Sequence, residues 1–373
     1  MKFAIEKENL VKVLSNVCGS IGKKNITIPI LLNTKLEVKN NKLSVTTTDL
    51  DVVITSSINV DSENNGSTTV PAQLFFDIAK KIPEGSQIMI ELAKDEKNLV
   101  IKYNKSKFKL PCLDPNDFPV IEQSGAYETF NISSQDLLHI VDKTRFAISN
   151  DEARYYLNGI YLHLKEEGKN KKIRGVATDG HRLAYAEAKA PNKLSQLTGV
   201  IIPKKTVNEI RKIIENVDEQ LDFSLSKAKL KLVTSNTVII SKLIDGEFPE
   251  YEKVIPTLND KEIKINKKVL FDAVDRVATI ATDKHKAIRL LISKNTLTLQ
   301  ADTTDGGFGN EELKICYTAE NIETGFNSRY MLDVLSQINE ENVILKFKDD
   351  ISPVILIGEK TDDALYVLMP VRI

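Results

Sequence analysis

Three residues within four positions of one segment could do chemistry. Asp179, His181 and Arg182 lie in the segment "GVATDGHRLAYAEA", Gly175–Ala188. A carboxylate beside an imidazole can transfer protons or bind a metal ion, and a guanidinium can bind a phosphate. The flanking residues alternate or run apolar, as they do in a strand. The segment is therefore either an active site or a turn between two strands.

The rest of the chain offers little to complete an active site. The four histidines show no HxxxH or HExxH spacing, and the sequence contains no P-loop and no nucleophile elbow. The three cysteines are far apart, which argues against a disulfide framework or a zinc ribbon. We expect no catalytic residue, no metal and no cofactor, and Asp179-Gly180 is a turn signal. The residues considered are His139, His163, His181, His285, Cys18, Cys112 and Cys316.

One pattern of apolar residues, typical of an amphipathic helix, occurs in three similar copies along the chain. The first helix of each copy follows a short alternating strand: "KFAIE", "TFNIS" or "EIKIN". A second helix of the same kind follows later in each copy. The expected helices are 7–18, 72–81, 134–147, 204–216, 267–279 and 328–339.

The repeated order of strands and helices predicts an α+β fold of three tandem domains. The expected domains are 1–125, 126–256 and 257–373, each with two helices on an antiparallel sheet. The polar segment Val60–Val70 between the two halves of the first copy is expected to be a loop.

Composition narrows the class of protein without deciding it. The chain has 373 residues, 42% of them hydrophobic, and a formal net charge of −1. The expected helices carry more basic than acidic residues, so they are either simply solvated or form a basic surface that faces phosphate. The first residues, "MKFAIEKENL", lack the apolar region of a signal peptide, and we expect a cytoplasmic protein.

Several segments together resemble the bacterial replicative sliding clamps, the beta subunits of DNA polymerase III. They are "VPAQLFFDIAKKIPEG", "RYYLNG", "VATDGHRLA", "SKLIDGEFPEY", "GFNSRYMLDVL" and "YVLMPVRI". The resemblance covers all three copies in order. It implies a head-to-tail homodimeric ring of six domains that encircles duplex DNA and acts as a processivity factor without catalysing a reaction itself. It also implies partners: the catalytic subunit of DNA polymerase III, the clamp-loader complex, and other polymerases and repair proteins that dock through short peptides.

The resemblance further implies three sets of site residues. The peptide pocket would consist of Leu157, Thr178, Gly180, His181, Arg182, Leu183, Pro249, Lys253, Val254, Val367, Met369, Pro370, Val371 and Arg372. The DNA contacts would come from Lys23 or Lys24, Lys80, Lys143, Arg154, Tyr155, Tyr156, Lys204, Lys205, Arg211 and Arg276. The dimer interface would contain Ile78, Lys105, Lys107, Phe108, Leu110, Ile280, Ala281, Glu311 and Glu312.

Three alternatives remain at this point. The chain could be a nucleic-acid hydrolase with a site at Asp179 and His181, although only the second copy has the His-Arg pair. The apolar residues of the expected pocket could only seal a domain interface, and those of the expected dimer interface could belong to their own domain cores.

Overall fold

The computed structural model of the chain describes residues 1–19, 21, 28–119, 128–168, 170–191, 194, 197–281, 286–303, 306–360 and 363–372. The predictions for Lys23, Lys24, His285 and Ile373, and the boundary expected near residue 125, lie outside these residues. Among the described residues, no helix combines the length and the apolar character that a membrane span requires.

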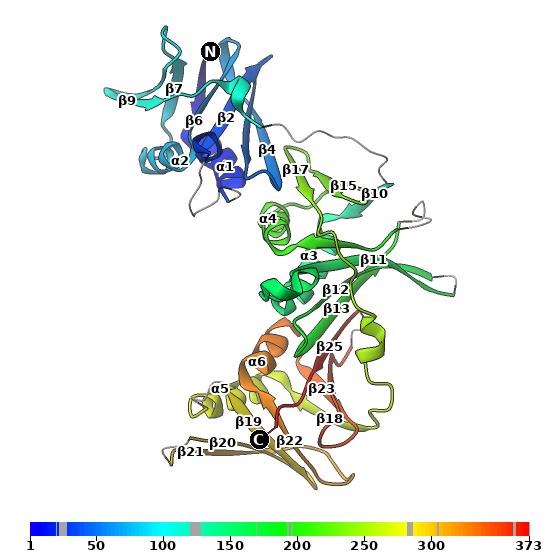
Figure 1. Cartoon of the computed structure of the whole chain (residues 1–373). Coiled ribbons are helices and arrows are strands. Elements are labelled where there is room, and N and C mark those ends of the chain that lie inside the picture. Colours follow the sequence, from blue (N-terminus) through cyan, green and yellow to red (C-terminus); the bar gives the residue numbers. More distant parts are fainter. Residues whose placement is uncertain are drawn as a thin grey trace. The chain divides into compact units, whose positions relative to one another are not determined.

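The first repeat alternates strands and helices in the predicted order (Figure 1). Its two helices are in contact with each other, and α1 also contacts strands β3 and β4. The elements are β1 (Lys2–Glu6), α1 (Lys7–Cys18), β2 (Asn33–Lys39), β3 (Lys42–Thr48), β4 (Val52–Asn59), β5 (Asp61–Asn64), β6 (Gly66–Pro71), α2 (Ala72–Lys81), β7 (Gln87–Leu92), β8 (Asn98–Tyr103) and β9 (Ser106–Pro111).

Among the described residues, the second repeat has the same order without a counterpart of β5. Two short 3-10 helices, η3 (Arg145–Ala147) and η4 (Glu152–Leu157), join its first helix to the next strand. The elements are β10 (Glu128–Ser133), α3 (Ser134–Thr144), β11 (Gly159–Glu167), β12 (Asn170–Thr178), β13 (Arg182–Lys189), β14 (Val200–Pro203), α4 (Lys204–Ile214), β15 (Gln220–Leu225), β16 (Lys229–Val233) and β17 (Thr237–Lys242).

The third repeat follows the short 3-10 helix η5 (Tyr251–Val254) and ends in a tail after its last strand. Its two helices are again in contact with each other. The elements are β18 (Lys261–Asn266), α5 (Lys267–Ala278), β19 (Ala287–Ser293), β20 (Thr296–Asp302), β21 (Phe308–Lys314), β22 (Ile322–Asn327), α6 (Ser328–Gln337), β23 (Asn342–Phe347), β24 (Val354–Gly358) and β25 (Ala364–Leu368).

The helices bury the faces that their sequence period predicts. In α1 the buried residues are Leu10, Val13, Leu14 and Val17, which are spaced as one stripe of a 3.6-residue helix. The equivalent stripe of α5 contains Leu270, Ala273, Val274 and Val277, all buried. Each stripe faces its repeat's strands, so the predicted arrangement of helices on antiparallel sheets is confirmed.

The prediction of a polar loop over Val60–Val70 is wrong, because this segment contains two strands. Strand β5 pairs with β1, and β6 pairs with β2. Thr68, Thr69 and Val70 are buried in β6. Threonine favours strands because it is β-branched, and its hydroxyl can be satisfied in a buried position. The polar composition of the segment therefore concealed a strand.

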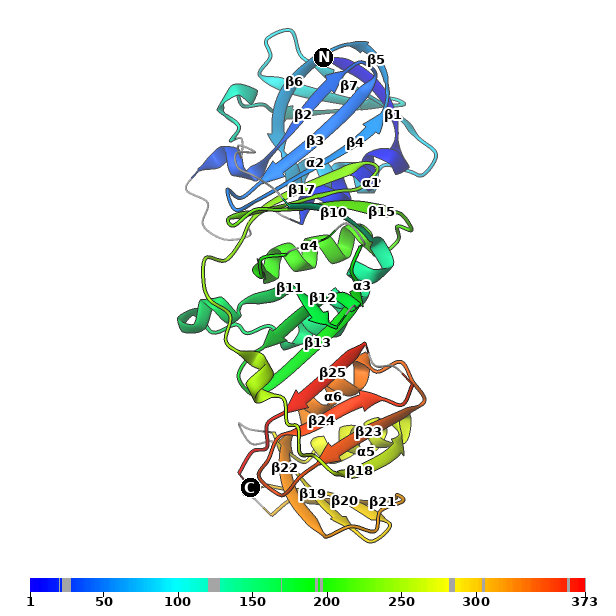
Figure 2. The ribbon, with the colours of Figure 1, turned by 90° about the vertical axis from the view of Figure 1, so that its right-hand side faces the viewer.

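Two sheets continue from one repeat into the next (Figure 2). Strand β4 of the first repeat pairs antiparallel with β17 of the second, and β13 of the second pairs with β25 of the third. For this reason the compact units of the chain do not follow the repeats. One unit comprises residues 1–135, 191–195 and 205–243, and the other comprises 136–190, 196–204 and 244–373. The predicted domain limits stay predictions.

Candidate peptide-docking site

The segment "TDGHR" forms the tight turn between β12 and β13. The Asp179 Oδ1 atom accepts hydrogen bonds from the backbone N–H groups of His181 and Arg182, both at 3.0 Å. The Thr178 hydroxyl accepts one from the N–H of Gly180 at 3.1 Å. Gly180 has φ +87°, a conformation that costs a residue with a Cβ atom more than it costs glycine. The carboxylate of Asp179 therefore serves the turn, as the sequence predicts for a strand–turn–strand segment.

The Arg182 side chain is buried, and its guanidinium is bonded to other residues of the chain. The side chain is 9% exposed, and its guanidinium bonds to the Asp179 carboxylate at 3.1 Å and to the Asp333 carboxylate of α6 at 2.6 Å. It also donates to the Phe146 carbonyl at 2.7 Å and lies 4.4 Å from the centre of the Tyr330 ring. Arg182 thus ties the second repeat to the third and is not available as a polar edge for a ligand.

His181 remains exposed at the surface of the turn, and its ring stacks on that of Tyr330 with centroids 6.1 Å apart. Sequence reasoning missed Phe146, Tyr330 and Asp333, because no local pattern marks contacts between residues this far apart. The described residues contain no cluster of histidine, cysteine, aspartate or glutamate that could hold a metal ion. With Asp179 bonded to the turn and to Arg182, the hydrolase alternative finds no support in this geometry.

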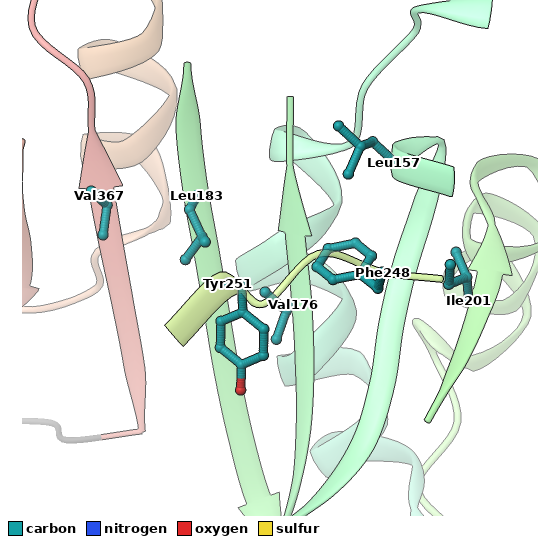
Figure 3. Packing of buried hydrophobic residues seen from close by; sticks show 7 residues of the cluster. All are labelled: Leu157, Val176, Leu183, Ile201, Phe248, Tyr251 and Val367. Carbon is teal, nitrogen blue, oxygen red and sulfur yellow. The ribbon is translucent and has the colours of Figure 1, made fainter. Parts of the chain in front are cut away.

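Behind the turn lies an apolar cluster that brings together three predicted pocket residues: Leu157, Leu183 and Val367 (Figure 3). Leu183 and Val367 are direct partners across the β13–β25 pairing. Sequence reasoning missed the other members of the cluster. Two of these, Phe248 and Tyr251, belong to the segment "GEFPEY" that joins the second repeat to the third, and the remaining two are Val176 and Ile201.

The tail after β25 is held by one backbone hydrogen bond to the turn and by another to strand β22. The N–H of Met369 donates to the carbonyl of His181 at 2.9 Å, and the N–H of Val371 donates to the carbonyl of Gly325 at 2.8 Å. Met369, Pro370 and Val371 are half-buried, while Arg372 is exposed. The predicted contribution of the tail to this site is thus consistent with its path.

A hollow of about 450 Å³ opens beside the tail. It brings together three predicted residues, Lys253, Val254 and Met369, whereas Pro249 is exposed and does not line it. Val254 is 43% and Leu258 68% exposed, which gives the hollow an open apolar wall. Sequence reasoning missed the rest of its lining: Ile255, Pro256, Thr257, Leu258, Asn259, Lys348, Ser352 and Pro353. We call the hollow and the adjacent turn with its tail the tail site.

Most predicted DNA-contacting side chains already have partners within the chain. Lys143 donates to the carbonyl of Gln337, and burial lowers its pKa. Arg276 bonds to Glu311 of β21, with Nε and Oε2 3.0 Å apart. The other partners are Asp151 for Arg154, Asn150 for Lys204, Asp49 for Lys205, Glu215 for Arg211 and the Phe76 ring for Lys80. Tyr155 is 52% exposed and Tyr156 is half-buried beside it.

Most of the predicted dimer residues lie on or next to two strands that end sheets, β9 and β21, whereas Ile78 lies on helix α2. Lys105, Lys107, Phe108 and Glu312 are exposed. Leu110 and Ala281 are 2% and 3% exposed and pack within their own repeats. The half-buried residues are Ile78, Ile280 and Glu311.

Three similar α+β domains in tandem, with sheets that continue across their junctions, define the class of DNA clamps. Models of the N-terminal, central and C-terminal domains of the DNA polymerase III beta subunit match residues 1–122, 131–250 and 252–372. The chain belongs to this family, the bacterial beta sliding clamps, and is a non-catalytic processivity factor of DNA polymerase III.

Relatives and solved structures match the whole chain. The beta sliding clamp of Caulobacter vibrioides is 39% identical and that of Escherichia coli 33%, each covering 100% of both chains. The crystal structure of the Caulobacter crescentus clamp with polyethylene glycol bound to its putative beta-motif tethering region has a TM-score of 0.96 and 38% identity, covering 100% of this chain and 99% of that one. The clamp of Bartonella birtlesii bound to griselimycin has the same TM-score and identity and is covered completely.

Proposed function

We propose that two copies of this chain join head to tail into a closed ring of six domains that encircles duplex DNA. Proteins of the replication machinery dock on the ring through short peptides, and the ring works in the cytoplasm. The observation that carries the proposal is the pair of open sheet edges at β9 and β21. Unpaired edges in a protein that stays soluble are normally covered or paired.

The two junctions inside the chain indicate which edges should meet. In each junction, the third strand after a repeat's first helix pairs with the last strand of the following repeat: β4 with β17, and β13 with β25. Strand β21 is likewise the third strand after α5, the first helix of the third repeat, and β9 is the last strand of the first repeat. Pairing β21 of one copy with β9 of another therefore repeats the same junction and closes a ring with two-fold symmetry.

The repeats also give a register for this pairing. Strands β4, β13 and β21 begin at Val52, Arg182 and Phe308, each three residues after an aspartate in the sequence. Strands β9 and β17 end at Pro111 and Lys242, each three residues before an aspartate. In the first junction Val52 lies opposite Ser241. Transferring that register places Phe308 opposite Leu110 of the partner subunit and Glu311 opposite Lys107 of the partner subunit. The reference aspartates are Asp49, Asp179, Asp305, Asp114 and Asp245.

We assign the DNA contacts to the basic residues of the helices and of the segments next to them. Such contacts neutralise phosphates without reading bases, so binding is independent of sequence and falls as salt rises. Several of these side chains are now held by acidic partners of the same chain, so each must exchange a weak surface ion pair for a phosphate.

We assign peptide docking to the tail site. Its apolar lining would accept leucine and phenylalanine side chains, and exposed His181 and backbone groups of the turn would hold a glutamine. Met369 suits a site with several partners, because a methionine side chain repacks easily. Each chain has one such site, so a dimer offers two to linked partners.

The test of the docking assignment is binding of a labelled peptide with glutamine followed by leucine and phenylalanine, measured by fluorescence anisotropy. We expect micromolar affinity, about −8 kcal/mol. Deleting residues 369–373 should abolish binding and leave the solution mass of the dimer unchanged. Unchanged affinity after this deletion would show that the peptide binds elsewhere.

A further inference from the structure

A buried polar network lies under the segment that supplies one wall of the tail site. We call residues 248–254, which include Phe248, Tyr251 and Val254, the wall segment. Tyr251 is 5% exposed and belongs to the same apolar cluster as Leu183 and Val367. Figure 3 shows its ring among these residues, at the start of the short helix that leads to Lys253 and Val254.

The hydroxyl of Tyr251 is bonded from two strands of the sheet. The Nε2 atom of His163 on β11 lies 2.9 Å from it, and the Nη1 atom of Arg174 on β12 donates to it at 3.1 Å. Arg174 is itself fixed by Glu187 on β13, whose carboxylate accepts from its Nε at 2.6 Å. Three neighbouring strands thus hold one hydroxyl of the wall segment.

The donors and acceptors of this network favour the neutral form of His163. Burial raises the pKa of Tyr251 to about 12, so its hydroxyl is neutral and has one hydrogen to donate. Because Arg174 can only donate, the hydroxyl oxygen accepts from Arg174. The one hydroxyl hydrogen has two acceptors within reach, Nε2 of His163 at 2.9 Å and Oε1 of Glu252 at 3.3 Å, and the shorter contact is to His163. A bond to Nε2 requires the neutral imidazole, whose other nitrogen faces the carbonyl of Leu164 at 3.1 Å.

A second contact of His163 reaches the same segment. Its ring stacks on Tyr161 at 4.9 Å, and Tyr161 stacks on Phe248 at 4.9 Å. The wall segment is therefore held at two points three residues apart: Phe248 by stacking and Tyr251 by its hydroxyl. From this geometry we infer that His163 and Arg174 are positioning residues of the tail site, because they fix the segment that presents Lys253 and Val254 to a docking peptide.

This inference rests on the proposed peptide docking and adds a pH dependence to it. A protonated His163 would place a second cation beside Arg174, and its Nε2 atom could no longer accept the hydrogen of the Tyr251 hydroxyl. Burial lowers the pKa of His163 in the structure with the wall segment in place. Peptide affinity is therefore fully present above the ordinary histidine pKa of about 6.5 and is lost as the pH falls below it.

The charged groups around His163 bear on this titration. The carbonyl of Leu164 and the carboxylate of Glu252 favour protonation, whereas Arg174 and Lys165 oppose it. Glu252 is paired with Lys165 at 2.5 Å, and its Oε1 atom is also an acceptor for the Tyr251 hydroxyl at 3.3 Å, a longer contact than that to His163. The carboxylate of Glu187 is bonded instead to Arg174 and to Lys172, each at 2.6 Å. The cations nearest the imidazole thus favour its neutral form.

The experiment measures binding of the uncharged, end-blocked glutamine–leucine–phenylalanine peptide to the full dimer between about pH 7.5 and pH 5.5. Tyr251→Phe should weaken binding about three- to tenfold at pH 7.5, because a buried guanidinium loses its acceptor. His163→Phe keeps the ring stack and should flatten the pH profile. Tyr317→Phe is the matched control and should leave binding unchanged, since it removes the hydroxyl of a similarly buried tyrosine, which bonds at 2.5 Å to the Glu320 carbonyl.

The outcomes separate this inference from the proposed docking. If wild-type protein fails to bind the peptide at pH 7.5, or the tail deletion binds it equally well, the docking assignment itself is wrong. If wild-type protein binds and the tail deletion does not, but Tyr251→Phe binds like wild type, the inference is overturned. If Tyr251→Phe does not fold, His163→Phe provides the test. A pH profile of peptide binding for His163→Phe that matches the wild-type profile would contradict the inference. His181→Gln should weaken binding at every pH, because His181 is assigned a peptide contact, but the relative loss of affinity between pH 7.5 and pH 5.5 should persist, since His163 is the titrating group.

Discussion

At the scale of single residues, Arg182 is a side chain of the site whose polar groups bond within the chain. It is bonded to two carboxylates and a carbonyl, and Asp333 comes from the following repeat. Arg182→Ala should lower the free energy of unfolding by about 2–3 kcal/mol, less than the loss of a fully buried pair, because Asp333 is 39% exposed. Urea unfolding measures this change. Arg289→Ala is the control, since its bond to Glu323 is 3.5 Å long and exposed, and it should cost about 1 kcal/mol or less.

Glu209 of α4 should make stability depend on pH. Its side chain is buried, packs against Gly19 after α1, and has an oxygen without a hydrogen-bond partner among the described residues. Burial raises its pKa, so the folded chain binds the proton more tightly than the unfolded chain does. Its contribution to stability is fully present below the unfolded pKa of about 4.3 and is lost as pH rises through the raised pKa.

Replacing this carboxyl by an amide removes the titration. Glu209→Gln should be as stable as wild type near pH 4 and more stable than wild type at pH 8. Urea unfolding at the two pH values measures the difference. A variant that is less stable than wild type at pH 8 would show that the carboxylate form is satisfied in the folded chain.

At the scale of elements, the helices were predictable and the long-range polar contacts were not. The stripe of α1 repeats every 3.6 residues in the sequence itself, so burial of Leu10 to Val17 follows from local pattern. The bond from Arg182 to Asp333 joins positions that only the folded sheets bring together. Strand β6 was missed because threonines hid its alternation, and the Tyr251 network was missed because a lone histidine gives no signal without its partners.

Strands β9 and β21 should form the dimer interface of the proposed ring. Glu311→Lys should turn the dimer into a monomer at micromolar concentration, because it faces Lys107 of the partner subunit in the proposed register. Combining Glu311→Lys with Lys107→Glu should restore the dimer mass in light scattering, since opposite charges across strands attract. Glu341→Lys, an exposed change before β23, is the control and should remain dimeric. A single variant that stays dimeric would exclude the proposed register.

At the scale of the whole molecule, the chain is one domain used three times, and the ring would be the same junction used six times. Two junctions of this kind lie within the chain, β4–β17 and β13–β25, and each is a continuous antiparallel sheet. A ring held by such sheets needs only weak, nonspecific contact with DNA, because closure rather than affinity keeps it on the duplex. Binding to short linear DNA should accordingly be weak and should fall steeply as salt rises.

Retention on closed against linear DNA tests the central claim most directly. The dimer is loaded on a nicked circular plasmid by a bacterial clamp-loader complex with ATP and then passed through a sizing column at moderate salt. The account predicts that the protein elutes with the circle and is released when a single restriction cut makes the plasmid linear. Equal retention on circular and linear DNA, or release from both, would contradict encirclement.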